Sequence, residues 1–156
     1  MTANSSQLGI NAFIEAIKQQ AAQTSPGWKN TAQFILRISD AYAGIRFKDI
    51  RHPRRFLMQL TGNPPVRFGK QGFNPELIDD SEPMRHYIAF VFVGFWLPYP
   101  LAGAFLWIWE ILGIFRHGIW GEADMKLGWI GIEHGGHVRR HGPAVLSHLI
   151  KRDLGE

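Results

Sequence analysis

A chain of 156 residues has the size of one domain, and a hydrophobic content of 46% is enough for a folded core. The absence of cysteine excludes disulfides, thiolate metal ligands and a cysteine nucleophile. The net charge of +4 favours an anionic partner, either nucleic acid or anionic lipid, or else an acidic protein partner. Because the N-terminus lacks the pattern of a signal peptide, we expect a cytoplasmic or peripheral membrane protein, with export by a non-classical route left open.

Two helical patterns occupy the first part of the chain. Apolar residues recur at helical spacing over 10–21 and again over 34–42, where Asn30 is the expected N-cap of the second helix. A short third helix is expected after Pro53. Its inward-facing residues are expected to be Phe56, Leu57 and Leu60.

A basic, irregular stretch over 61–74 follows these helices. We expect an ordered loop, because Val66, Phe68 and Phe73 are apolar and can anchor it. Acidic residues then gather at 79–82, just before a helix that Pro83 is suited to begin.

The segment from Tyr87 to Phe115 is apolar apart from one charge, Glu110. The sequence Pro98-Tyr99-Pro100 interrupts it, and proline cannot lie within a continuous helix without a break. We therefore expect two helices, over 83–97 and 100–115, that fold back as a hairpin and lie mostly in the core.

Two other roles for this apolar hairpin remain open. The stretch 88–106 has no charged residue and suggests a membrane segment. Each half of the hairpin spans only roughly 22 Å, less than the hydrocarbon core of roughly 30 Å, so insertion of the hairpin 87–115 is favoured over a span. The other role is a protein–protein interaction module that docks through the hairpin.

The C-terminal part predicts two more helices. One extends from Glu122 to about His141 and ends before Gly142-Pro143, and an amphipathic helix follows from Val145 to Leu154. No segment has the pattern of a strand. We therefore predict a single all-α domain over 1–156 with six to seven helices, in which 1–71 holds the N-terminal helices and basic loop and 72–156 carries the candidate site.

His86 and Glu110 are each 12 positions from Pro98. A hairpin that turns at this proline brings them to the same level, so we expect them to pair. Such a pair can fix the histidine tautomer or share a divalent metal ion, with Arg85 beside it to hold an anionic group. The alternative is a structural pair that fastens the open end of the hairpin.

Asp124 begins a helix face that continues through Gly128, Gly131 and Gly135. Three glycines on one face indicate that another helix or a ligand approaches the backbone closely. Asp124 can then point to the same place as His86 and Glu110. The alternative is an acidic residue stabilised by the helix dipole.

His134, His137 and His141 have a spacing that can bind a transition metal on a helix, although a solvated basic face is the alternative. The motifs of P-loop nucleotide hydrolases and serine hydrolases are absent from the sequence. Exposed basic clusters are expected, and one of them contains Lys48, Arg51, Arg54 and Arg55.

The order of these residues, from Gly72-Phe73-Asn74-Pro75-Glu76 through Arg85-His86 and Glu110 to Asp124-x-x-Leu-Gly-x-x-Gly, resembles uncharacterised bacterial all-helical domains. Such domains occur in hypothetical proteins and at the C-termini of polymorphic toxins, and the likeness covers 72–135. It implies that His86, Glu110 and Asp124 line one site. We expect a metal-dependent or acid/base hydrolase that acts on a phosphate-containing substrate, although the hairpin is more apolar than in those domains.

Overall fold

The computed structural model describes residues 9–52, 54–55, 66–79, 82–118 and 121–156. These residues form an all-α domain, as predicted. Its elements are α1 (Ile10–Ala22), α2 (Trp28–Ala43), the 3-10 helices η1 (Phe47–Arg51) and η2 (Pro75–Leu77), α4 (Pro83–Trp96), α5 (Tyr99–His117), α6 (Glu122–His141) and α7 (Val145–Asp153). Within the described ranges, the β-structure amounts to one isolated bridge between Phe73 and Gly155.

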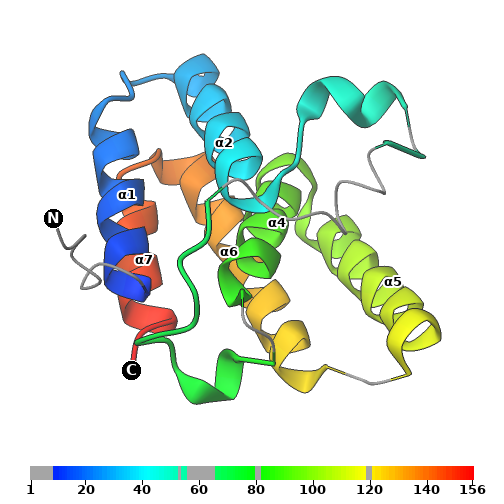
Figure 1. Ribbon diagram of the computed structural model, residues 1–156. Coiled ribbons are helices and arrows are strands. Elements are labelled where there is room, and N and C mark those ends of the chain that lie inside the picture. The colour runs from blue at the N-terminus through cyan, green and yellow to red at the C-terminus, as the bar shows by residue number, and fades with distance from the viewer. Residues whose placement is uncertain (1–8, 53, 56–65, 80–81, 119–120) are drawn as a thin grey trace, which may run out of the picture.

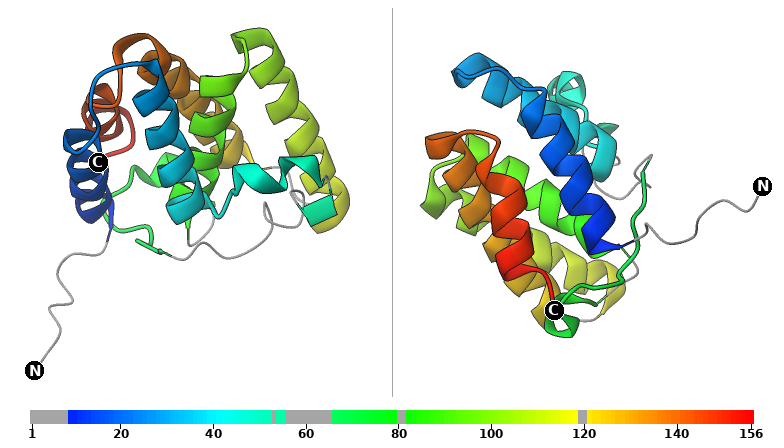
Figure 2. Two further views of the ribbon diagram at one scale, coloured as in Figure 1. Left: turned by 90° about the horizontal axis from the view of Figure 1, so that it is seen from above. Right: turned by 90° about the vertical axis from the view of Figure 1, so that its left-hand side faces the viewer.

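The helices pack around α4, which occupies the middle of the molecule in Figure 1. α6 and α2 pack against α4, and α1 packs against α7 along one edge of the molecule. α5 forms the opposite edge and contacts α6 (Figures 1 and 2). The candidate site residues therefore come from the central helix and from the two helices that follow it.

α4 and α6 approach each other so closely that backbone meets backbone. A methyl group at Gly131 would lie 2.8 Å from the carbonyl oxygen of Tyr87, and one at Gly135 would clash with the carbonyl oxygen of Val91. The glycine face of α6 thus accommodates another helix, which was one of the two explanations predicted for it. This close packing fixes the beginning of α6 relative to the beginning of α4.

Only the inner side of the hairpin belongs to the hydrophobic core. In α4, the side chains of Tyr87, Ile88 and Phe95 are fully buried. In α5, Ala102 and Leu106 are buried, but the outward side chains are exposed, so the prediction that the hairpin lies mostly in the core is correct for α4 and wrong for the outer half of α5. None of the described helices has the length and hydropathy needed to cross a bilayer.

Two local predictions are wrong and one lies partly outside the described residues. Asn30 is not the N-cap of α2, because the helix begins at Trp28 after Gly27 and Asn30 lies in its first turn. There, Nδ2 of Asn30 donates a hydrogen bond to the carbonyl oxygen of Pro26 at 3.0 Å. Val66 is 41% exposed and does not anchor the loop, whereas Phe73 is buried. Of the short helix predicted after Pro53, residues 54–55 are helical, and the inward-facing residues Phe56, Leu57 and Leu60 lie outside the described residues.

Candidate functional site

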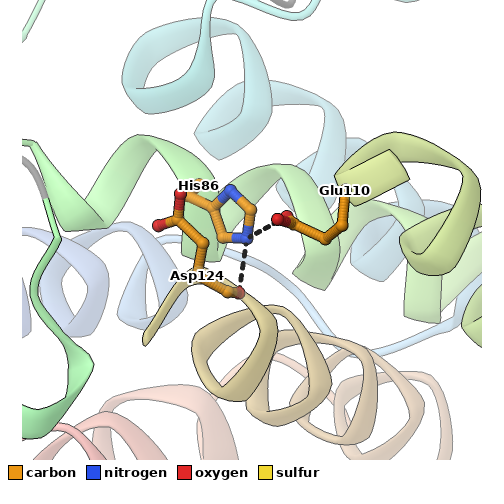
Figure 3. Close-up of side chains that lie close together, drawn as sticks. All are labelled: His86, Glu110 and Asp124. Atoms are coloured by element: carbon orange, nitrogen blue, oxygen red, sulfur yellow. Dashed lines mark hydrogen bonds and ion pairs between the residues drawn. The ribbon is translucent and has the colours of Figure 1, made fainter. Parts of the chain in front are cut away.

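Three side chains from three helices converge at one end of the domain. His86 comes from α4, Glu110 from α5 and Asp124 from α6, and Figure 3 shows the three side by side. One ligand atom from each lies within 4.8 Å of the other two, and Nε2 of His86 lies 3.8 Å from Oε1 of Glu110. The predicted proximity of His86 and Glu110 is confirmed, and Asp124 joins them.

Local sequence explains why these side chains meet. Pro83 begins α4, which places His86 in its first turn, and Glu122 begins α6, which places Asp124 in its first turn. Glu110 follows the buried Leu106 by four residues, so it lies on the same inward face of α5. Asp124 lies at the beginning of α6, where backbone N–H groups and the helix dipole favour a carboxylate, whereas Glu110 lies beyond the middle of α5.

Gly128 provides the space in which these helices meet. A methyl group on Gly128 would lie 2.5 Å from Cδ1 of Leu106 and 3.3 Å from Nε2 of His86. The side chain of Leu106 could not give way without moving α5, since it is fully buried. The absence of a side chain at Gly128 therefore sets the distance between Glu110 and His86.

A backbone hydrogen bond determines the tautomer of His86. Its Nε2 lies 2.8 Å from the carbonyl oxygen of Asp124 (Figure 3). Because a carbonyl oxygen only accepts hydrogen bonds, Nε2 carries a proton and donates it to the backbone of Asp124. A cation held through Nε2 would have to replace this hydrogen bond.

Glu110 lies in surroundings that oppose its negative charge. Its side chain is 9% exposed, and burial raises its pKa from 4.5 to about 7, with further contributions from the carboxylates of Asp124 and Asp79. A buried carboxylate with acidic neighbours needs a proton or a cation to compensate its charge. Near neutral pH, Glu110 can therefore exchange a proton or bind a positive ion.

Asp79 is a neighbour of the site that we did not predict. Its Oδ2 lies 3.4 Å from the backbone nitrogen of Asp124, at the beginning of α6. Gly121 leaves room for it, since a methyl group there would lie 2.9 Å from the same oxygen. The acidic run 79–82 just before α4 was the signal for this position.

Arg85, which we predicted to hold an anionic group, is in the first turn of α4 and is partly exposed.

The three histidines of α6 do not converge. His134 is 1% exposed, accepts a hydrogen bond at Nδ1 from the hydroxyl of Tyr87 and donates from Nε2 to Asp153, both at 2.8 Å. His137 instead pairs with Glu133 and stacks on His141.

His134 therefore links α6 to α4 and α7, and its burial lowers its pKa despite the opposing effect of Asp153. Within the described ranges, the group of three side chains placed to bind one metal ion is His86, Glu110 and Asp124.

Family models, curated proteins and solved structures give no match to this chain. The resemblance to bacterial helical domains stays a prediction.

Proposed function

We propose that His86, Glu110 and Asp124 bind a divalent metal ion and that the protein is a metal-dependent hydrolase of phosphate esters. One observation carries this proposal: three residues from three helices place their ligand atoms within 4.8 Å of one another. One imidazole and two carboxylates form a ligand set that suits Mn²⁺ or Zn²⁺ better than a soft metal, and the chain has no thiolate to offer.

The charge balance supports a cation at this position. The carboxylates of Glu110 and Asp124 lie beside a single imidazole, and Asp79 adds a third negative charge nearby. An uncompensated charge on Glu110 is costly at its depth of burial. A divalent ion would keep Glu110 ionised at neutral pH and would offset much of the repulsion among the acids.

The chemistry follows from the ligand number. A divalent ion held by three protein ligands supplies a Lewis acid and an activated water. Before a metal ion binds, the hydrogen bond from Nε2 of His86 to the backbone holds the ring beside Glu110. In this proposal Arg85 binds the phosphate of the substrate, which agrees with the positive net charge of the chain.

Acid/base hydrolysis without a metal is the second candidate. Burial raises the pKa of Glu110 to about 7, which suits a group that accepts and returns a proton near neutral pH. In that case Glu110 acts as the general base and Asp124 helps to hold the site together. The two candidates differ in their response to a chelator.

Hydrolysis of bis(p-nitrophenyl) phosphate, with and without EDTA, tests the proposal. We expect Mn²⁺ or Zn²⁺ to restore the activity that EDTA removes, and Asp124→Asn to lower the rate by about a hundredfold. Glu122→Gln is the matched control, because this exposed residue in the same turn of α6 pairs with Lys126. Activity that EDTA leaves unchanged would favour the acid/base candidate, and no hydrolysis under any condition would contradict both.

A further inference from the structure

α5 has an exposed apolar face. We call it the α5 outer face and define it by six side chains that are between 45% and 84% exposed. They are Leu101, Trp107, Ile108, Ile111, Leu112 and Phe115. Soluble proteins seldom leave so many large apolar side chains together in water without a role in binding.

The α5 outer face is continuous and uncharged. Leu101, Ile108 and Phe115 are seven residues apart, Ile111 and Leu112 lie three and four residues after Ile108, and Trp107 lies four residues before Ile111. All six are therefore on one side of the helix. The one charged residue between Tyr99 and Phe115 is Glu110, whose side chain points inward to the candidate site. Apolar helix faces that contain tryptophan, leucine and phenylalanine enter the boundary between lipid headgroups and acyl chains when basic residues accompany them.

Exposed basic residues lie at the same edge of the molecule. We call Lys48, Arg51, Arg54 and Arg55 the basic segment, and all four are exposed. η1 and residues 54–55, which carry them, lie above α5 on the same side of the molecule in Figure 1, and they overlap the C-terminal end of α5 in the left view of Figure 2, which is seen from above. Asp49, which lies within this stretch, is half-buried.

We propose that the α5 outer face docks on a bilayer that contains anionic lipid, with the basic segment against the lipid headgroups. The apolar side chains would enter the boundary between headgroups and acyl chains, and the four cations would be attracted to the negative surface. This places α5 parallel to the membrane, in agreement with the finding that no described helix is suited to span one. The proposal does not depend on the metal site.

Charge distinguishes a membrane from a second copy of the chain. A symmetric dimer through α5 would bring together two chains of the same charge, which repel each other. This net charge is +4 for each chain. An anionic surface instead meets the apolar face and the basic segment with complementary properties.

Co-sedimentation with lipid vesicles tests the proposal. We compare vesicles of phosphatidylcholine alone with vesicles that contain about one third phosphatidylglycerol. The protein should bind the anionic vesicles, and its binding should weaken as salt is added. We expect the partition coefficient to fall about tenfold or more in Ile108→Gln/Leu112→Gln and by a similar factor in Arg54→Gln/Arg55→Gln.

Matched controls distinguish binding through this surface from non-specific binding to vesicles. Val66→Gln removes an exposed apolar side chain outside α5, and Arg140→Gln/Lys151→Gln removes two exposed cations from α6 and α7. Both controls should bind vesicles like the parent protein, and circular dichroism should be the same for all variants. The proposal is overturned if anionic vesicles do not sediment the protein, or if the α5 variant binds them unchanged. It is also overturned if the parent protein does not bind vesicles and light scattering shows that it is a dimer, whereas the α5 variant is a monomer.

Discussion

Replacing Glu110 by glutamine should change how the stability of the protein depends on pH. Burial, with Asp124 and Asp79 nearby, raises the pKa of Glu110 from 4.5 to about 7, so the folded state holds a proton that the unfolded state has lost. The stabilising effect of that proton is complete below about pH 4.5 and disappears as the pH rises through about 7. The shift corresponds to about 3 kcal/mol, at about 1.4 kcal/mol for each pKa unit.

Urea denaturation in EDTA at about pH 5 and about pH 8 measures this effect. We expect the unfolding free energy of the parent protein to fall by about 3 kcal/mol more than that of Glu110→Gln between these pH values. Using the difference between the two proteins removes the contribution of His134, whose pKa burial lowers.

A bound metal ion should offset this loss of unfolding free energy at the higher pH. An ion at about 100 times its dissociation constant would stabilise the folded protein at the higher pH by about 2.7 kcal/mol. Equal pH dependence in the parent protein and in Glu110→Gln would refute the account of a charged, buried carboxylate.

Two further predictions concern packing, and each has a matched control in the same helix. Gly135→Ala should lower the unfolding free energy by more than about 2 kcal/mol, because its methyl group would clash with α4. Gly136→Ala is the control and should be tolerated, since the nearest neighbour of its methyl group would be an arginine side-chain atom at 3.6 Å. His134→Leu should cost about 2 to 4 kcal/mol, because it leaves the buried Tyr87 hydroxyl and Asp153 without this partner, whereas His137→Leu should change stability by less than about 1 kcal/mol. Urea denaturation measures both pairs, and equal losses within either pair would contradict the packing described.

Much of the helical arrangement could be predicted from local chemistry. The limits of α1 follow from apolar spacing, the end of α6 follows from Gly142, and the break at Pro98 follows from the missing backbone donor of proline. The proximity of His86 and Glu110 needed only their equal distance from that break. The start of α2 was harder, because Gly27 precedes it without a side-chain cap.

Other features depend on tertiary packing and leave weaker traces in the sequence. The inner and outer sides of α5 are both apolar, so residue type alone could not tell which side faces water. The inward orientation of His134 depends on Tyr87 and Asp153, which are distant in sequence. Asp79 reaches the site because of the tertiary position of the segment before α4, which no periodic pattern reveals.

Titration of the protein with Mn²⁺, followed by electron paramagnetic resonance, tests the central claim most directly. The account predicts one tightly bound ion per chain in the parent protein and in Glu122→Gln, and an affinity lower by about tenfold to a hundredfold in Glu110→Gln and Asp124→Asn. A parent protein that binds no Mn²⁺ or Zn²⁺, or one whose metal affinity these two substitutions leave unchanged, would contradict it.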